Sequence, residues 1–339
     1  MLGYTKLMSK PKSKEKGFSL GKLWIKEPYS KTRFLSVPAR GVIDLFRPFT
    51  LFAPFFVSMA IMVASLIYTN VVNGAVIKPI PDDWWQTVGQ AAFTLAIVNA
   101  ASNSLNQATD VEADKISKPH RPIPRGVVKA EGAQSLAYIL YLFALIRAVT
   151  LNVWFGTFVF LIMLFTVTYS LPPRMKQYLF VNQIWIAIPR GMFGILASWS
   201  VFGDPFTATP LIIGGVATLY LVGGMASKDI TDAEADKKTG TRTLINTYGN
   251  KKTALICFPF MFFSMALIPM FINQGLIANY LWPLTLFVFM SIFVSYLIYR
   301  GSESKTLENV HAWAIMYVQY IFFAMAFSLL TIFKDVLPF

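Results

Sequence analysis

Long apolar segments, each close to the length of a membrane span, recur through the whole chain. A membrane-spanning helix needs about 20 mostly apolar residues, and nine segments of the sequence fit this requirement. We expect these segments at 49–69, 87–109, 133–149, 153–170, 180–202, 209–227, 253–272, 281–299 and 311–333. A backbone in lipid must satisfy its own hydrogen bonds, so such segments form helices. The sequence therefore predicts an all-α, multi-pass membrane protein with about nine transmembrane helices.

The distribution of charge fits this interpretation. Only 14% of the residues are charged, whereas soluble proteins carry about 25%. A net charge of +13 would otherwise suggest a nucleic-acid partner, but 26 of the 30 Lys and Arg residues lie in the N-terminal segment and in alternate connections. Because cytoplasmic loops are enriched in Lys and Arg, we expect a cytoplasmic N-terminus, a C-terminus on the opposite side, and no nucleic-acid partner.

The same counts suggest how the chain is divided. Residues 1–41 are polar and rich in Lys, and they lack the apolar core of a secretory signal. We expect them to form a basic cytoplasmic tail, which membrane lipid with anionic headgroups would attract. Residues 42–339 are then a single transmembrane domain.

Acidic residues are scarce, and seven of the 17 fall in two short motifs at the cytoplasmic ends of the second and sixth expected spans. The sequences are Thr-Asp-Val-Glu-Ala-Asp-Lys at 109–115 and Thr-Asp-Ala-Glu-Ala-Asp-Lys at 231–237, identical at six of seven positions. An internal duplication explains this match, as in other membrane folds built from repeats. We expect two pseudo-repeats, at about 42–205 and 206–339.

Helical spacing shows which of these polar side chains lie together, since residues four apart share one face. The first row consists of Asn106, Asp110 and Asp114 and continues into the membrane through Asn103 and Asn99. The second row consists of Asp229, Asp232 and Asp236. Glu112 and Glu234 are two positions out of phase, so we expect them to point elsewhere. The two rows predict the wall of a polar cavity.

Carboxylates at this spacing repel one another unless a cation lies between them. Mg²⁺ suits such a site because it prefers oxygen ligands and often keeps phosphate oxygens in its shell. With one Cys and two His in the chain, a thiolate or His-rich metal site is excluded. We expect two Mg²⁺ ions bridging a diphosphate. The candidate ligands are Asn106, Asp110, Asp114, Asp229, Asp232 and Asp236.

At these residues the chain resembles the UbiA superfamily of intramembrane prenyltransferases. The first signature of that family, Asn-Asp-x-x-Asp-x-x-x-Asp followed by Arg-Pro-x-Pro, reads here from Asn106 to Asp114, followed by Arg-Pro-Ile-Pro from Arg121. The second signature, Asp-x-x-Asp-x-x-x-Asp with a following Gly and Thr-Leu, reads from Asp229 to Asp236, with Gly240 and Thr243-Leu244 downstream. The resemblance extends over about residues 42–333.

The resemblance implies a helical bundle around a central cavity that has both acidic motifs at its cytoplasmic mouth. The reaction would transfer an isoprenoid chain from a prenyl diphosphate to a lipophilic acceptor after ionisation of the allylic diphosphate. It assigns catalytic roles to Asp110, Asp114, Asp232, Asp236 and Tyr169. Arg190 is a substrate ligand on other grounds, because a charge within a span usually faces an interior cavity. The candidate substrate-binding residues are Arg47, Asn103, Lys118, Arg121, Arg174, Lys176, Arg190, Lys228 and Arg242.

Two features depart from the family pattern. Gln107 replaces the Asp of the first signature, so one expected carboxylate is absent. The family's Tyr-Ser segment reads Tyr-Ser-Leu-Pro-Pro from Tyr169, which resembles the chlorophyll-synthase branch, but the basic residues Arg174 and Lys176 fall at other offsets. Which of these two cations faces the site is left open by the sequence.

Two questions of function are also open at this point. By family analogy the acceptor is first a hydroxylated aromatic quinone precursor, with an archaeal glycerol-phosphate lipid, a chlorin or haem as alternatives. The competing class of function is a cation or organic-anion transporter. Transporter sites usually lie near the bilayer midplane, whereas both acidic motifs are expected at one membrane surface, which favours the enzyme.

Overall fold

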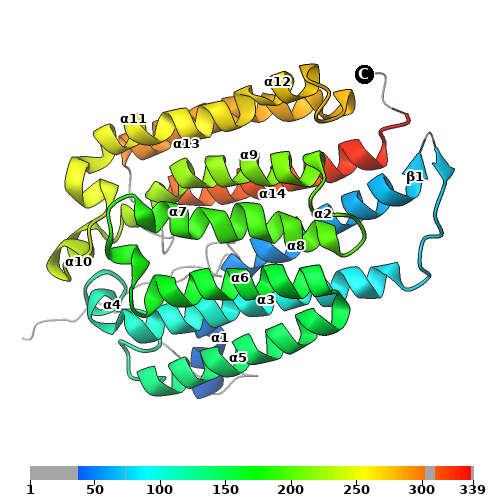
Figure 1. Ribbon diagram of the computed structural model, residues 1–339. Helices are drawn as coiled ribbons and strands as arrows, with labels where there is room; N and C mark the ends of the chain where they lie inside the picture. Colours follow the sequence, from blue (N-terminus) through cyan, green and yellow to red (C-terminus); the bar gives the residue numbers. More distant parts are fainter. Residues whose placement is uncertain (1–36, 73, 302–309, 337–339) are drawn as a thin grey trace, which may run out of the picture.

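The computed structural model describes residues 37–72, 74–301 and 310–336. Most of the expected basic tail, residues 1–36, lies outside the described residues. The helices run lengthwise in one bundle, with α4 and α10 at one end and the short β1–β2 hairpin at the other (Figure 1). Apart from that hairpin of two-residue strands, the regular structure of the described chain is helical. The all-α fold class is confirmed.

The elements follow one another with short connections. The first half contains α1 (Val37–Phe46), α2 (Pro48–Asn70), β1 (Val71–Val72), β2 (Ala75–Val76), α3 (Trp84–Thr109), α4 (Val111–Ser117), α5 (Ala130–Leu151), α6 (Val153–Ser170), η2 (Met175–Gln177), α7 (Val181–Ile188), η3 (Pro189–Phe193) and α8 (Gly194–Ser200). The second half contains α9 (Ala208–Gly224), η4 (Met225–Asp229), α10 (Ala233–Lys238), α11 (Leu244–Ala266), α12 (Ile268–Asn273), η5 (Asn279–Leu286), α13 (Phe287–Arg300) and α14 (His311–Ile332).

Seven of the helical runs in the described chain are long and apolar enough to span a membrane. They begin at Pro48, Ala130, Val153, Ala208, Leu244, Asn279 and His311. The other two expected spans correspond to α3, which carries the polar row, and to the continuous run of α7, η3 and α8, which a π-helical turn divides. Integral, multi-pass membrane insertion follows from these helices. The number of nine spans stays a prediction.

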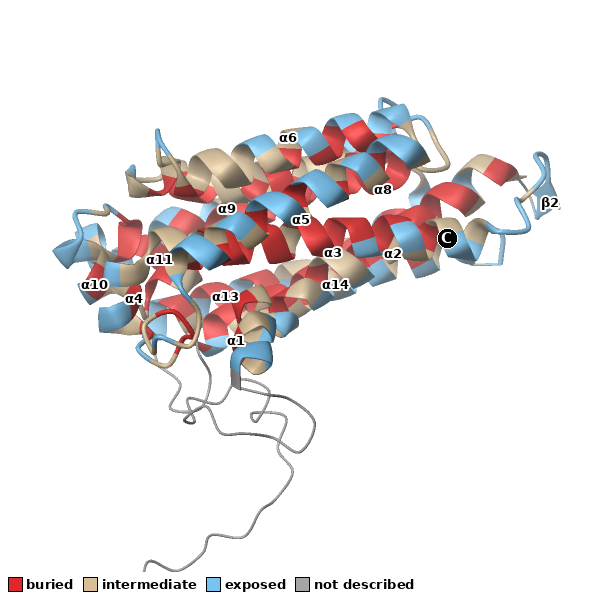
Figure 2. Cartoon of the chain, turned by 90° about the horizontal axis from the view of Figure 1, so that it is seen from below, coloured by how far each residue is buried: buried red, intermediate tan, exposed pale blue. Residues whose placement is uncertain are grey.

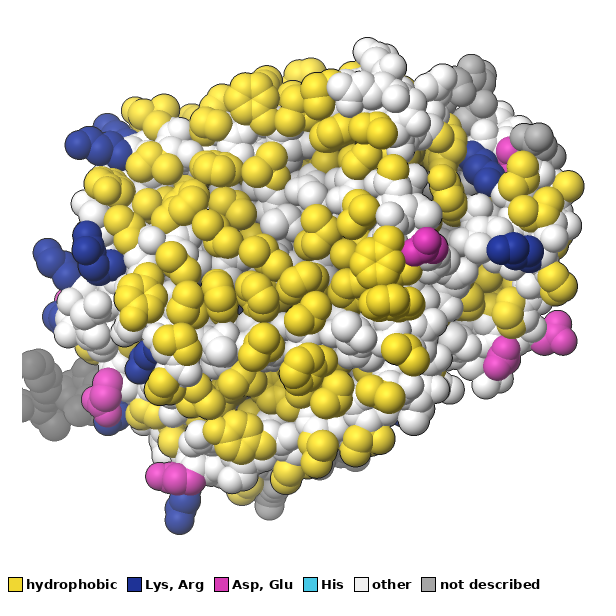
Figure 3. Space-filling view, in the orientation of Figure 1, with side chains coloured by type: hydrophobic (Ala, Val, Ile, Leu, Met, Phe, Trp, Pro, Cys, Tyr) yellow, Lys and Arg dark blue, Asp and Glu magenta, His cyan; other side chains and the backbone are white. Residues whose placement is uncertain are grey.

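The surface of the bundle shows the belt that a bilayer requires. Apolar side chains cover its middle, and charged side chains gather near its two ends (Figure 3). Large apolar residues point outward along the belt, as in Ile139, Leu255 and Phe289, each more than 60% exposed. The outer faces of α5 and α11 are accordingly exposed while their inner faces are buried (Figure 2). Such a surface is suited to lipid and not to water.

Polar contacts between helices position the interior. Asn103 on α3 donates through Nδ2 to the backbone oxygen of Phe46 and to Oγ1 of Thr50, both at 2.8 Å, and Asn99 donates to the oxygen of Thr50. In hydrocarbon such bonds between helices contribute about 0.6 kcal/mol on average. The polar row of α3 therefore holds the end of α1 and the start of α2 against α3.

Candidate functional site

A polar cavity opens at the α4–α10 end of the bundle, where residues from both halves of the chain meet. The predicted site residues that line it are Arg47, Asn103, Asn106, Asp110, Asp114, Lys118, Arg121, Tyr169, Arg174, Lys176, Arg190, Lys228, Asp229, Asp232 and Asp236. The exception is Arg242, whose exposed side chain does not line the cavity. Thus the structure gathers nearly all of the predicted residues in one place.

The two acidic motifs are built in the same way. Each begins at the inner end of a span, breaks at the central Asp, and continues into a short helix, α4 or α10. Asp110 and Asp232 occupy the N-cap positions, and the backbone N–H of Asp114 and of Asp236 donates to the oxygen of the respective cap residue at 2.8 Å. The α4 and α10 helices contact one another across the cavity. The breaks bring each motif back over the cavity, which one straight helix would not do.

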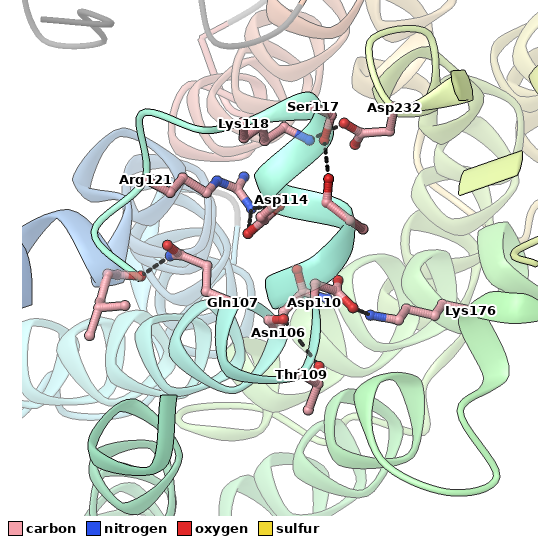
Figure 4. Close-up of polar contacts among 12 residues, drawn as sticks. Asn106, Gln107, Thr109, Asp110, Asp114, Ser117, Lys118, Arg121, Lys176 and Asp232 are labelled. Carbon is pink, nitrogen blue, oxygen red and sulfur yellow. Dashed lines mark hydrogen bonds and ion pairs between the residues drawn. The ribbon is translucent and has the colours of Figure 1, made fainter. Parts of the chain in front are cut away.

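Most of the motif carboxylates are paired with cations (Figure 4). Arg121 forms two hydrogen bonds to Asp114, at 2.8 and 2.9 Å, and both side chains are buried. Lys118 of the first motif region bonds Asp232 of the second, so the pair connects the two motifs. Burial opposes the ionisation of Asp232, but Lys118 and Arg121 together hold its pKa below the ordinary value. Lys228 pairs with Asp229.

Arg174 and Lys176 both face the site. Arg174 Nη2 lies 2.9 Å from Oδ1 of Asp110, and Lys176 bonds the same oxygen. Burial of Lys176 lowers the pKa of its ammonium group despite the neighbouring carboxylate of Asp110. The question that the unusual offsets left open is therefore resolved, because the turn at η2 directs both cations toward Asp110.

Asp236 differs from the other motif carboxylates. Within the described residues it has neither a hydrogen bond nor an ion pair through its side chain. Burial, together with repulsion from Asp229 and Asp232, raises the pKa of Asp236 to about 7. The cavity thus contains an acidic group that no cation of the described residues bonds, although the charges of Lys228 and Lys118 act on it from a greater distance.

The oxygen ligands present fit a divalent cation such as Mg²⁺. Asp236 lines the cavity together with Asp229 and Asp232, whose charges act on it, and no Cys or His lies among the described residues that line the cavity. In the part of the chain described, no three Asp, Glu, His or Cys side chains already form a metal cluster. Because Mg²⁺ usually takes several ligands from water and phosphate, the carboxylates need not close around it alone.

The departure at Gln107 removes no ligand from the cavity. Its side chain is 1% exposed and points away from Asp110, donating through Nε2 to the backbone oxygen of Leu45 on α1 at 2.8 Å (Figure 4). An Asp at this position would project from the same face of α3, the face that contacts α1. Glu112 and Glu234 also point away, as the spacing predicts, and pair with Lys115 and Lys238 at the surface.

Two cations of the site sit in an uncommon backbone conformation. Arg47 and Arg174 have φ values of 51° and 54°, in the left-handed region that non-glycine residues rarely adopt. Such residues concentrate at functional sites, where the surrounding structure fixes them. Both arginines end a turn at the cavity, Arg47 as the N-cap of α2 and Arg174 as the N-cap of η2.

Sequence reasoning missed several residues of the cavity. Asn182, Trp185, Trp313 and Tyr317 line it from α7 and α14. The ring of Trp185 stacks on Phe165 at 4.4 Å between centroids, and Asn182 has a buried Oδ1 without a partner in the described chain. No spacing rule indicates these residues, because they lie in apolar spans and only packing turns them inward.

A second pocket extends the polar cavity toward the middle of the bundle. We call it the inner pocket. It is mostly apolar, with walls from Pro54, Val57, Leu95, Val98, Ile162 and Leu221. Five residues line both spaces: Thr166, Pro189, Arg190, Met225 and Tyr317. A ligand with a charged head and an apolar chain would fit these two spaces, with its head in the polar cavity and its chain in the inner pocket.

The sequence matches the model of a known family, and curated relatives agree with that match. The model of the UbiA prenyltransferase family matches residues 67–319. A digeranylgeranylglyceryl phosphate synthase of Methanosphaera stadtmanae is 27% identical over 63% of this chain and 76% of that protein. The synthase of the same name from Methanobrevibacter smithii is 25% identical over 71% of this chain and 87% of that protein.

Solved structures share the fold. A structure concerned with a digeranylgeranylglyceryl phosphate synthase in membranes superposes with a TM-score of 0.58 at 20% identity, covering 86% of this chain and 99% of that one. A UbiA homolog from Archaeoglobus fulgidus, bound to DMAPP and Mg²⁺, gives a TM-score of 0.62 at 16% identity and covers 84% and 98%. At these identities the likeness is one of fold.

Proposed function

This chain belongs to the UbiA prenyltransferase family, and from this premise we propose that it transfers an isoprenoid chain from a prenyl diphosphate to a hydroxylated lipophilic acceptor with the help of Mg²⁺. One observation carries the proposal: two copies of an acidic motif share a single cavity that leads into an apolar pocket. The family assignment also decides against the transporter that the sequence alone left open.

We assign the diphosphate to the cations and carboxylates at the mouth of the polar cavity. Asn106, Asp110, Asp114, Asp229, Asp232 and Asp236 are the candidate ligands of the metal. Bound Mg²⁺ would supply Lewis-acid stabilisation of the leaving diphosphate. Lys118, Lys176 and Lys228 each bond a motif carboxylate now and lie within reach of the same space, so they can transfer their hydrogen bonds to diphosphate oxygens. Hydrogen bonds between charged groups are stronger than those between neutral groups.

The allylic carbon then loses its bond to the diphosphate oxygen and acquires positive charge. Tyr169 lies beside this space, and Lys176 Nζ is already 5.9 Å from the centroid of its ring. A ring face that accepts an ammonium group also stabilises a carbocation by the same attraction. The apolar inner pocket excludes water from the cation, so the acceptor hydroxyl is the available nucleophile. Its oxygen forms the new bond to carbon and releases its proton.

For the acceptor we propose first a glycerol-phosphate lipid. The synthases that match this chain are named for digeranylgeranylglyceryl phosphate, a product with two isoprenoid chains on one glyceryl phosphate. A prenyl transfer that completes such a product adds the second chain to a lipid that carries one. The hydroxylated aromatic acceptor is the second candidate, because Trp185, Trp313 and Tyr317 give the cavity an aromatic lining.

We propose that the N-terminus is cytoplasmic and the C-terminus lies on the opposite side. Lys and Arg residues of α4, α10 and their connections belong to the end of the bundle where the acidic motifs line the polar cavity. This asymmetry follows the positive-inside rule. The substrate diphosphate would then enter from the cytoplasm.

Diphosphate release from a labelled prenyl diphosphate tests the proposal. Release should require Mg²⁺ and should fall at least about 100-fold in Asp110→Ala and in Asp232→Ala, because each removes a carboxylate from the charged centre of the cavity. Glu112→Ala is the matched control, since this acid of the same motif pairs with Lys115 outside the cavity. Ion flux in proteoliposomes without any diphosphate release would overturn the proposal. Mass spectrometry of lipid products would identify the acceptor.

A further inference from the structure

A charged side chain, Arg190, lies deeper than the acidic motifs, at the junction of the polar cavity and the inner pocket. It belongs to η3, a π-helical turn of residues Pro189–Phe193 inside an otherwise α-helical run. Such turns are rare and are frequent at functional sites. Gly191 permits the turn to pack against α9, because a Cβ there would lie 2.6 Å from Cα of Thr218. The π-helical turn that carries Arg190 therefore packs tightly against α9.

Neutral groups hold the guanidinium in place. Arg190 Nη1 donates to the hydroxyl oxygen of Tyr317 at 2.9 Å and approaches Sδ of Met225 at 3.9 Å. The hydroxyl of Tyr320 donates to the backbone oxygen of Arg190 at 2.7 Å. Two tyrosines of α14 therefore fix both the side chain and the backbone of this residue.

No carboxylate pairs with Arg190 in the described part of the chain, and its other N–H groups have no partner there. This sets it apart from Lys118, Lys176 and Lys228, each of which bonds a motif carboxylate. A charge within a membrane span is costly, and it usually finds an opposite charge or a polar path. A bound ligand with a negative charge could therefore pair with the Arg190 guanidinium.

The depth of Arg190 separates it from the diphosphate site. Its neighbour Met225 precedes Asp229 by four residues in the 3-10 helix η4, which is about 8 Å along the axis. The mouth of the cavity already gathers five carboxylates and several cations around the proposed metal and diphosphate. An anion at Arg190 would lie one helical turn further in, where the apolar walls begin.

We propose that Arg190, oriented by Tyr317, binds an anionic group of the prenyl acceptor, so that the acceptor of this enzyme is a hydroxylated lipophile with its own phosphate or carboxylate. The inference rests on the proposed function and narrows its substrate class. The guanidinium recognises either anion through paired hydrogen bonds. The acceptor hydroxyl is then directed outward, toward the carbon that leaves the diphosphate.

Binding measurements on the purified protein test this assignment without relying on turnover. The probes are geranylgeranylglyceryl phosphate and its phosphate-free alcohol, and 4-hydroxybenzoate and its methyl ester. Each is titrated in detergent micelles with Mg²⁺ and a prenyl thiodiphosphate, a donor analogue that ionises slowly. The two pairs distinguish a phosphate acceptor from a carboxylate acceptor, because each neutral member lacks only the anionic charge.

We expect wild-type protein to bind one anionic probe at least about 10-fold more tightly than its neutral partner. In Arg190→Gln this preference should disappear, since a charge-assisted hydrogen bond typically contributes a factor of about 10 to 100 in binding. Affinity for the donor analogue should fall much less than affinity for the anionic acceptor. Tyr317→Phe should reduce the preference by about threefold, because the guanidinium keeps its charge but loses the hydroxyl that orients it.

Arg147→Gln is the matched control. Arg147 is a second arginine within a span, where it contacts Thr94 and the ring of Phe143 and lines neither space. It should leave the preference for the anionic probe intact.

Three results would overturn the inference. The first is equal binding of both members of each probe pair by wild-type protein. The second is a preference that persists in Arg190→Gln or, if that variant does not fold, a preference that is undiminished in Tyr317→Phe. The third is a loss of donor-analogue binding as large as the loss of acceptor binding, which would place Arg190 in the diphosphate site. Diphosphate release by wild-type protein is measured separately, so failure of the proposed function is distinguishable.

Discussion

Charge compensation around single residues explains much of the chemistry of the polar cavity. Asp114 is buried, which raises the pKa of its carboxyl group, while the two hydrogen bonds from Arg121 act in the opposite direction. Asp232 obtains the same compensation from Lys118. Asp236 has no such partner in the described chain and faces two other acids. Among the motif carboxylates of the described chain, Asp236 is therefore the one that is free to bond a ligand.

Substitution of Asp236 should separate stability from activity. In protein freed of metal by chelation, at about pH 8, we expect Asp236→Asn to raise the melting temperature, because a buried charge is removed and the repulsion from Asp229 and Asp232 is relieved. Diphosphate release with Mg²⁺ should fall by about 100-fold, since the metal and diphosphate lose one oxygen ligand of full charge. Thermal melts in detergent and the release assay measure the two effects.

Glu234→Gln provides the comparison within the same motif. Glu234 is exposed and pairs with Lys238 on the surface of α10, and exposed ion pairs contribute little. Neither the melting temperature nor the release of diphosphate should change measurably in this variant. A fall in the melting temperature of Asp236→Asn in metal-free protein would contradict the repulsion that we describe.

At the level of elements, interruptions of helices decide where the functional side chains point. The spans α3 and α9 end in breaks at Asp110 and around η4, and the run from α7 to α8 contains the π turn η3. A regular helix would turn each residue by a constant angle. The breaks change that angle beside the cavity, so they influence which side chains converge there.

The close approach of η3 to α9 gives a prediction at this scale. In Gly191→Ala the added Cβ would lie 2.4 Å from Oγ1 and 2.6 Å from Cα of Thr218, so the helices must separate. We expect a loss of about 1–3 kcal/mol in stability from overpacking, together with weaker acceptor binding as Arg190 shifts. Chemical or thermal unfolding in detergent measures the first effect.

Gly89→Ala serves as the control, because Gly89 lies within α3 and a Cβ there meets no atom within 4 Å. Alanine is the better helix former, so this variant should be as stable as wild-type protein or slightly more so. If Gly191→Ala is equally well tolerated, the contact between η3 and α9 does not position Arg190.

The whole molecule has two chemically different ends separated by an apolar belt. Figure 1 shows α4 and α10 at one end and the β1–β2 hairpin at the other, and Figure 3 shows the apolar surface between them. The acidic motifs that line the polar cavity lie at the first of these ends. The orientation in the membrane therefore decides which compartment supplies the diphosphate.

Labelling of single cysteines tests the proposed orientation. The chain has one native cysteine, Cys257, which is buried, so Cys257→Ser gives a background without thiols. In that background Glu234→Cys marks the α10 end, and Asp82→Cys marks the exposed connection at the hairpin end. A membrane-impermeant maleimide should label only Asp82→Cys in intact cells and should label Glu234→Cys after permeabilisation. The reverse pattern would show that the cavity opens outward.

The sequence by itself determined the fold class, the family resemblance and most of the residues that line the polar cavity. Runs of about 20 apolar residues leave the backbone no alternative to helices in lipid, and a duplicated acidic motif stands out in a chain with few acids. Both signals are contained in short stretches of sequence, so they can be recognised without knowledge of the tertiary structure.

Only the tertiary structure decided how these residues combine. The side chain of Gln107 points to α1, Arg174 and Lys176 share Asp110, and Trp185 and Tyr317 turn inward from apolar spans. It also showed that Arg242 lies outside the cavity and that Arg190 stands apart from the carboxylates. Each of these facts depends on the angle at which helices break and pack. Spacing along one helix cannot define that angle, because it is set by contacts between helices that are distant in sequence.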